Sequence, residues 1–177
     1  PFCYTFSDDI INIIKKTNIS SSFSPATGLQ TGNNTKFIRT WFETSNSDLR
    51  IKWFPLVNGG NFRKWYGNLT DIIYWNEDGK DIKNCKSSVL RNKQFYQKSG
   101  ITWNRIASKG ITIRAFPSGC LFDQAGDSMF CNDIDKLYTS MSYLNTKVAK
   151  IFFDMLAPTI NLTAGMIGQL PYIDKES

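Results

Sequence analysis

One arrangement of acidic and basic residues in this chain of 177 residues could support catalysis. Asp71 precedes Asp78-Gly79-Lys80, and Asp81-Ile82-Lys83 follows, which gives the Asp…(Asp/Glu)-X-Lys spacing used in metal-dependent cleavage of nucleic acids. Two carboxylates would bind Mg²⁺ there, and the lysine would help to activate water. A turn explains the same residues better, because Asn76-Glu77-Asp78-Gly79 has the composition of a strand-ending turn and charged residues gather at turns. We therefore favour a turn over a nuclease centred on Asp71, Asp78 and Lys80.

Other catalytic arrangements are missing from the sequence. The chain has no histidine, which excludes Ser-His-Asp and Cys-His catalysis and the usual histidine-bearing metal sites. Neither a GxxxxGK[ST] phosphate-binding loop nor a GxGxxG dinucleotide-binding motif occurs. None of the six prolines is adjacent to another, so the Asn/Asp-Pro-Pro-aromatic tetrapeptide of amino-methyltransferases is missing too. No catalytic residue, metal site or cofactor is therefore expected in this chain.

The cysteines and the apolar runs narrow the class of protein. The four cysteines are widely spaced and form no CxxC pair, so we expect free thiols in a cytoplasmic protein rather than zinc ligands or disulfides. No apolar run approaches the roughly 18 residues that a membrane span needs. The start at Pro1-Phe2-Cys3 has neither a methionine nor a leader pattern, and we expect the chain to be a fragment of a longer protein.

Basic charge is concentrated in one stretch. Residues 36–114 hold fifteen Lys/Arg against six Asp/Glu, a balance of +9, and the remainder of the chain has a balance of −3. A basic stretch favours a polyanion as the partner, because neutralising phosphates releases counterions. Charge alone fits a solvated basic face without a partner equally well.

The run Asn58-Gly59-Gly60-Asn61-Phe62-Arg63-Lys64-Trp65-Tyr66-Gly67 has the composition of a DNA-binding surface. Arginine can read guanine, lysine can neutralise phosphate, asparagine can pair with adenine, and glycines let the backbone approach a groove. A structural alternative makes Trp65 and Tyr66 the core anchors of a hairpin. The run 91–98 shows the same mixture and the same ambiguity.

These considerations define the candidates for contact with double-stranded DNA. The first group is cationic and comprises Arg39, Lys52, Arg63, Lys64, Arg91, Lys93, Arg105 and Arg114. The second group comprises Asn61, Trp65 and Tyr66.

The periodicity of apolar residues predicts an α+β fold, with a strand-rich central sheet and helices at the N- and C-terminal ends. A capped helix is predicted at 7–18, then a connector at 20–32 and a short helix or strand at 37–42. Strands are predicted at 49–54, ended by Pro55, and at 72–75, 101–105, 111–116, 120–123 and 128–130, with 101–105 and 111–116 forming a hairpin. A helix followed by a loop is predicted over 80–98, and one amphipathic core helix over 137–155.

Several short segments of the sequence resemble segments that occur in the same order in large bacterial adenine-specific DNA methyltransferases of the BREX or Pgl phage-defence type. These enzymes are related to single-chain restriction-modification enzymes. The resemblance runs from about residue 24 to residue 172 and includes Gly100-Ile101-Thr102-Trp103, which is similar to a signature of specificity domains. The other similar segments are 27–34 with 36–41, 52–55, 59–60 with 63–68, 75–83, 144–148, 158–161 and 170–171.

This resemblance implies that residues 24–177 form a target-recognition domain, and that 1–23 are a helix and connector from an upstream domain. In that family the catalytic domain lies upstream and would methylate adenine with S-adenosylmethionine. The resemblance therefore implies two partners, double-stranded DNA and the upstream methyltransferase domain. It also implies a location in the bacterial cytoplasm. The alternative is a protein-interaction module that docks the parent enzyme to other defence-system subunits.

Overall fold

The computed structural model describes residue 12 and residues 18–106, 110–156 and 161–172. Apart from Asn12 and Asn18, the helix predicted at 7–18 lies outside the described residues, so its prediction stays open. The division into segments 1–23 and 24–177 stays a prediction as well.

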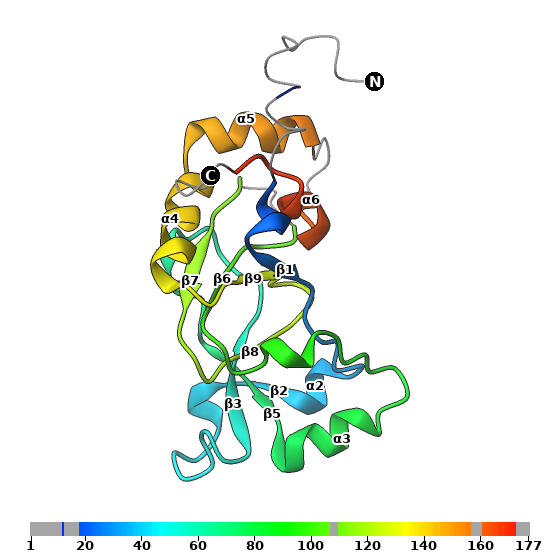
Figure 1. Ribbon diagram of the computed structural model, residues 1–177. Coiled ribbons are helices and arrows are strands. Elements are labelled where there is room, and N and C mark those ends of the chain that lie inside the picture. Colours follow the sequence, from blue (N-terminus) through cyan, green and yellow to red (C-terminus); the bar gives the residue numbers. More distant parts are fainter. Residues whose placement is uncertain (1–11, 13–17, 107–109, 157–160, 173–177) are drawn as a thin grey trace.

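The strands form two mixed sheets, one above the other in Figure 1. The upper sheet has five strands, in the order β1 (Ser24–Ala26), β9 (Ser128–Phe130), β6 (Gly100–Thr102), β7 (Arg114–Phe116) and β4 (Trp65–Tyr66). The lower sheet has four, in the order β2 (Ile38–Thr40), β5 (Asp71–Tyr74), β3 (Trp53–Val57) and β8 (Leu121–Phe122). Neighbouring strands are antiparallel except for the pairs β4–β7 and β3–β8. The α+β prediction is confirmed, with two sheets in place of one central sheet.

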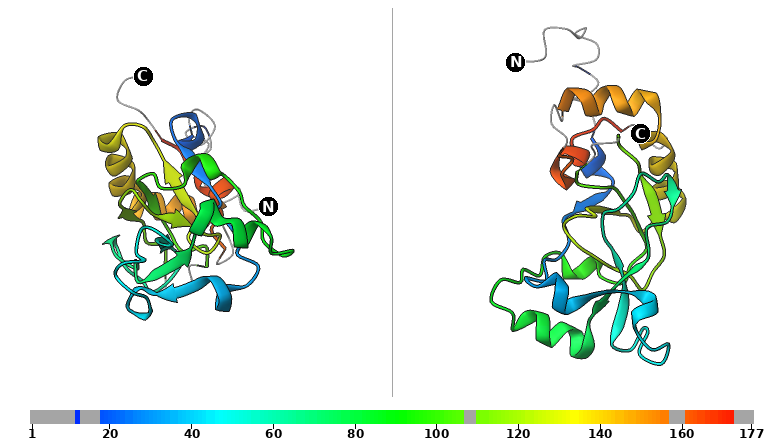
Figure 2. Two further views of the ribbon diagram at one scale, coloured as in Figure 1. Left: turned by 90° about the horizontal axis from the view of Figure 1, so that it is seen from below. Right: turned by 180° about the vertical axis from the view of Figure 1, so that it is seen from behind.

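The helices divide between the two sheets (Figures 1 and 2). The longer ones gather around the upper sheet: α4 (Ile134–Leu144), α5 (Lys147–Leu156) and α6 (Ala164–Gly168), with the 3-10 turn η2 (Ile19–Ser21). Shorter helices occur in the segments that surround the lower sheet: α2 (Asn34–Phe37), η3 (Trp41–Glu43), η4 (Asn76–Gly79), α3 (Lys80–Lys83) and η5 (Lys93–Phe95). The prediction of a helix followed by a loop over 80–98 is confirmed, with a helix of one turn (α3) and the short η5 within the segment that follows.

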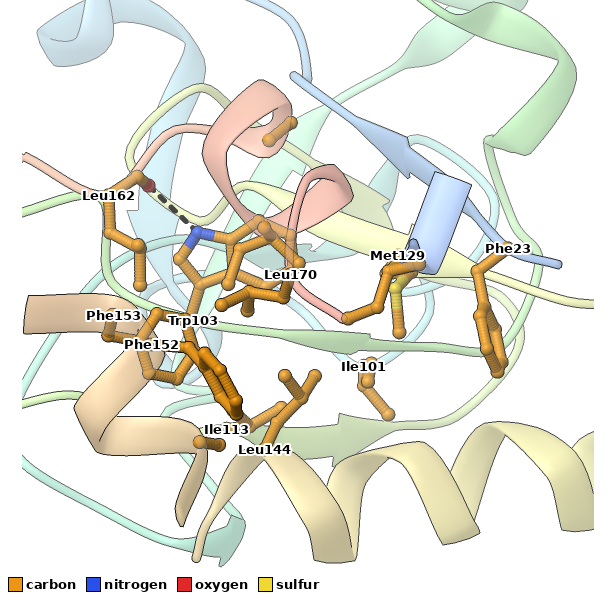
Figure 3. Packing of buried hydrophobic residues seen from close by; sticks show 14 of the residues in the cluster. Phe23, Ile101, Trp103, Ile113, Met129, Leu144, Phe152, Phe153, Leu162 and Leu170 are labelled. Atoms are coloured by element: carbon orange, nitrogen blue, oxygen red, sulfur yellow. Dashed lines mark hydrogen bonds between the residues drawn. The ribbon is translucent and has the colours of Figure 1, made fainter. Parts of the chain in front are cut away.

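The largest core lies between the upper sheet and its helices (Figure 3). Ile101 and Ile113 supply its sheet side, while Leu144, Phe152 and Phe153 supply its helix side. Trp103 is fully buried at its centre, and its indole N–H donates a hydrogen bond of 2.9 Å to the carbonyl oxygen of Leu162. That bond ties the segment before α6 to the end of β6.

Buried apolar side chains, several of them aromatic, join the two sheets into one body. Phe116 and Phe130 come from the upper sheet, and Val57 and Phe122 come from the lower one, and all are buried in one cluster. Phe95 stacks on Phe130 with ring centroids 4.5 Å apart. Because each sheet buries a face against the other, we expect the two sheets to unfold together.

The predicted single helix at the C-terminal end is wrong. It is two helices, interrupted at Asn145 and Thr146. Asn145 uses its side-chain amide to accept a hydrogen bond from the Ile113 N–H (3.1 Å) and to donate one to the Ile113 carbonyl (2.8 Å), and the Thr146 hydroxyl accepts from the Ala149 N–H. The break rotates α5, so Val148 is exposed although its spacing predicted a core position.

Two strand predictions also change. The strand predicted at 49–54 is displaced to Trp53–Val57, so Pro55 lies within β3 instead of ending a strand. Proline is tolerated there because β8 pairs with β3 only from Leu56 onward, which leaves Pro55 a neighbour on one side alone. The hairpin is confirmed as β6 paired antiparallel with β7, although both strands are shorter than predicted.

Replacing Trp103 with Phe should destabilise the protein. The change leaves the buried Leu162 carbonyl without its donor and opens a space in the core. We expect the free energy of unfolding in urea to fall by about 2–4 kcal/mol. The exposed Trp41 is the control (51% exposed), and Trp41→Phe should change stability by less than about 0.5 kcal/mol. Equal losses in the two variants would contradict a special role for Trp103.

Candidate nucleic-acid interface

Residues 58–67, which we call the glycine loop, run from the end of β3 through β4. Gly60 and Gly67 have φ values of +130° and +122°, a backbone conformation that side chains rarely adopt. Asn104 donates a hydrogen bond of 2.6 Å to the Gly60 carbonyl, and Asn68 donates one of 2.8 Å to the Asn61 carbonyl. These bonds fix the main chain, so the loop presents its side chains from a defined position.

Trp65 and Tyr66 are surface residues. Their exposed fractions are 52% and 59%, on a strand that pairs only with β7 within its sheet. The interpretation that made them core anchors of a hairpin is therefore wrong. Trp65 has a φ of +72°, a left-handed conformation that costs a bulky residue about 1–2 kcal/mol.

Arg63 and Lys64 precede these aromatics and are exposed as well. The Lys64 ammonium donates a hydrogen bond of 3.3 Å to the Asn145 carbonyl at the end of α4. Arg63 crosses Gly67 so closely that a Cβ there would lie 2.7 Å from the Arg63 Cδ. Two adjacent cations and two aromatic rings thus share one short surface segment.

Arg114 has to be removed from the DNA-contact candidates. It is 1% exposed, and burial lowers the pKa of its guanidinium to about 10. Its Nη2 donates to the carbonyls of Asn58 (3.3 Å) and Gly59 (3.5 Å), while Trp65 is its strand partner in β4. The Arg114 side chain therefore holds the beginning of the glycine loop, and the end is held by strand pairing, in which the Trp65 N–H donates to the carbonyl of the preceding Ile113 (3.3 Å).

Arg105 is the other cation that the fold brings to the glycine loop. A pocket of about 520 Å³ lies between them, lined by Asn58, Gly59, Gly60, Asn104, Arg105, Ile106, Gln124, Ala125 and Asn161. Sequence reasoning missed Asn104, Gln124 and Asn161, because they lie far from the loop along the chain and no local pattern marks them. Phe62, 51% exposed, lies inside the run that the sequence had already singled out.

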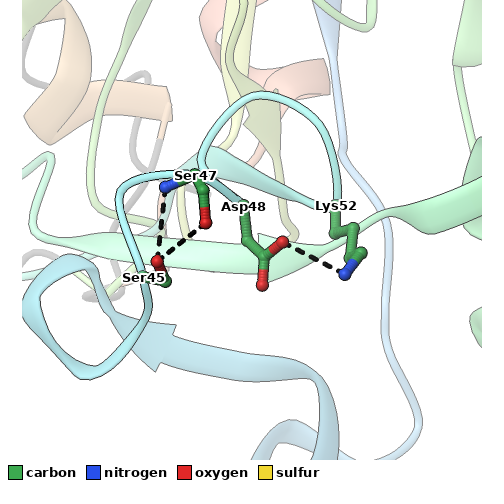
Figure 4. A network of polar contacts seen from close by, with 4 residues as sticks. All are labelled: Ser45, Ser47, Asp48 and Lys52. Carbon is green, nitrogen blue, oxygen red and sulfur yellow. Dashed lines mark hydrogen bonds and ion pairs between the residues drawn. The ribbon is translucent and has the colours of Figure 1, made fainter.

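The remaining four candidates lie on other elements. Arg39 turns its guanidinium back to the carbonyls of Thr35 and Ile38. Lys52 pairs with Asp48 at 3.1 Å, beside the hydrogen-bonded Ser45 and Ser47 (Figure 4). Arg91 donates to the side chain of Gln30 at 3.3 Å, and Lys93 begins η5. The structure does not gather these four with the glycine loop into one cluster.

Two buried carboxylates, Asp123 and Asp127, flank the pocket residues Gln124 and Ala125 in the sequence. Asp123 is 7% exposed and accepts hydrogen bonds from the N–H groups of Ala125 (2.7 Å) and Gly126 (3.1 Å). Burial raises the pKa of Asp123 to about 6 in spite of these bonds. Burial also raises the pKa of Asp127, which accepts from the Ala164 N–H at 3.0 Å.

The residues of the possible nuclease centre do not assemble into a metal site. Asp78 pairs with Lys83 at 2.6 Å and Lys80 pairs with Glu77 at 2.8 Å, all on the surface. Gly79 has a φ of +73° and a Cβ there would lie 2.5 Å from the Trp75 ring, so the turn needs glycine. No group of three potential metal ligands of the His, Cys, Asp or Glu type occurs among the described residues. The turn interpretation therefore accounts for the motif.

The cysteines and helices add two observations. Cys85, Cys120 and Cys131 are free thiols. Within the ranges that the structure describes, every helix is too short or too polar to cross a membrane.

Comparison with known proteins relates the chain to one class of enzyme. No family model matches it. Its curated homologues are adenine-specific methyltransferases, as the similar sequence segments indicated. They include BrxX of Escherichia coli O9:H4 (strain HS), which is 36% identical over 155 residues, and PglX of Lacticaseibacillus casei (strain Zhang), which is 32% identical over 197 residues. The similarity covers 82% and 100% of this chain, but only 13% and 16% of the length of those two proteins.

Replacing Asp123 with Asn should stabilise the protein above about pH 6. Because the folded-state pKa (about 6) lies above the ordinary 3.8, the folded protein keeps a proton that the unfolded chain releases between those pH values, and stability falls as pH rises through that window. The amide of the variant would keep an acceptor oxygen without the charge. We expect a gain of about 1–3 kcal/mol at pH 8 that disappears below about pH 4, measured by urea unfolding at both pH values.

The exposed Asp154 supplies the control for this experiment, because a solvated carboxylate is not destabilised by burial. Asp154→Asn should show no such pH-dependent gain. A gain from Asp123→Asn that is the same at both pH values would contradict the proposed cause.

Proposed function

We propose that this chain is a DNA target-recognition domain, which positions double-stranded DNA for adenine methylation by a catalytic domain in another part of the parent enzyme. That catalytic domain would bind the methyl donor S-adenosylmethionine. The single observation that carries the proposal is the glycine loop, where Arg63, Lys64, Trp65 and Tyr66 are exposed together on a fixed backbone. The names of the homologues, adenine-specific methyltransferases, support the proposal because adenine is a base of nucleic acids.

The chemistry of the loop suits a DNA groove. Exposed Lys64 can neutralise a phosphate, and Arg63 can donate two parallel hydrogen bonds to guanine. Arg105 lies across the adjoining pocket and adds a third cation. Glycines at 59 and 60 keep the loop narrow. Phosphate contacts would supply most of the affinity, and base contacts would supply the sequence preference.

DNA binding through the glycine loop should depend on salt and on two cations. We expect the affinity for duplex DNA, measured by mobility shift or fluorescence anisotropy, to fall steeply with salt. Arg63→Glu with Lys64→Glu should lower the affinity and flatten the slope of log affinity against log salt by at least about 1, because the lost phosphate contact of Lys64 removes about one unit.

A matched control changes the same charge elsewhere. Lys80→Glu with Lys83→Glu alters two exposed lysines of α3, whose surface ion pairs contribute little to stability. This variant should bind DNA nearly as the wild type does. Equal weakening in both double variants would mean that only net charge matters. Binding that ignores salt would favour the alternative, a module that docks the parent enzyme to other defence-system subunits.

A further inference from the structure

The glycine loop carries a second kind of recognition chemistry beside its cations. We propose that Trp65 and Tyr66 form a stacking site for an unpaired nucleobase, so that the loop binds DNA best where a base has left the double helix. This inference rests on the proposed DNA-binding function. It adds the form of DNA that the site takes.

Both rings are available to a ligand. Their exposed fractions exceed one half, although large aromatic side chains are normally well buried. Within the described ranges, neither the Trp65 indole N–H nor the Tyr66 hydroxyl has a hydrogen-bond partner, and neither ring contacts another aromatic ring. More than half of each side chain therefore remains open to a ligand.

The main chain that carries the rings is held in place before any ligand binds. Trp65 keeps its φ of +72° while its N–H donates to the Ile113 carbonyl at 3.3 Å and its residue pairs with Arg114 of β7. Strained residues of this kind persist only where surrounding contacts fix them, and they concentrate at binding sites. A main chain that is already fixed loses little freedom when its side chain stacks on a base, which favours affinity.

The neighbouring charges indicate which ligand the rings accept. From residue 61 to residue 68 the chain has two cations, Arg63 and Lys64, and no acidic residue. Cations beside exposed aromatic rings are the combination that binds single-stranded nucleic acid, because the cations contact phosphates while the rings stack on bases. In an intact duplex both faces of a base are covered by its neighbours. A stacking site therefore needs DNA with an unpaired base.

The experiment compares two forms of DNA with the whole chain. Two labelled duplexes of one sequence are titrated, one fully paired and the other with a short central mismatch that carries 2-aminopurine. The wild type should bind the mismatched duplex more tightly by about 5- to 100-fold. Stacking should also quench the 2-aminopurine fluorescence, a readout that requires no variant.

Trp65→Gly removes the ring without destabilising the fold. Glycine adopts positive φ without strain, so the variant should unfold at a temperature no lower than the wild type while it loses the preference for mismatched DNA and the quenching. Trp41→Ala is the matched control, because Trp41 is equally exposed (51%) but lies in η3. It should keep both. Tyr66→Ala serves as the second variant if Trp65→Gly fails to fold, and it should weaken the preference.

The outcomes separate this inference from the proposed function. Equal binding of paired and mismatched duplexes by the wild type, without quenching, overturns the stacking site and leaves salt-dependent duplex binding intact. Retention of the preference by Trp65→Gly, or its loss in Trp41→Ala, also overturns it. Failure to bind either DNA overturns both proposals.

Discussion

Strand β7 determines where the surface of the glycine loop lies. At Arg114 it pairs on one side with Thr102 of β6 and on the other with Trp65 of β4. The Arg114 side chain then reaches the carbonyls of Asn58 and Gly59. The glycine loop is thus attached at its beginning to the Arg114 side chain and at its end to the neighbouring Ile113 carbonyl. The cost is a desolvated guanidinium whose Nε and Nη1 have no hydrogen-bond partner among the described residues, which only a tightly packed environment can maintain.

Asparagine side chains complete the main-chain hydrogen bonding where the regular elements stop. The Asn145 side chain bonds both the N–H and the carbonyl of Ile113. Asn104 donates to the Gly60 carbonyl, and Asn68 donates to the Asn61 carbonyl. An amide side chain carries one donor and one acceptor side, so it can replace a missing strand neighbour. This explains how short strands and irregular loops remain ordered without leaving many buried backbone groups unpaired.

Negative and positive charges occupy different places around the glycine loop, because the carboxylates nearby are buried and the cations of the loop are exposed. The two raised carboxyl pKa values belong to the buried turn of Asp123 and Asp127, on the protein side of the glycine loop and its pocket. The side chains of Arg63 and Lys64 are exposed, although the Lys64 ammonium also donates to the Asn145 carbonyl. Several other cations of the basic stretch are paired with carboxylates or carbonyls, as Lys52, Lys83 and Arg39 show. The +9 balance therefore overstates the number of positive charges available to a polyanion.

The sequence by itself determined the α+β class, the β6–β7 hairpin, the Asp78-Gly79 turn and the run of the glycine loop, because each depends on local periodicity or on residues that are neighbours in the chain. Only the tertiary structure decided that Trp65 is exposed and Arg114 buried, since composition does not say which side of a strand meets a core. It also broke the C-terminal helix at Asn145, where hydrogen bonds to a residue 32 positions away outweigh helical periodicity. Arg105 and Gln124 reach the loop by the same kind of long-range pairing, which one sequence does not reveal.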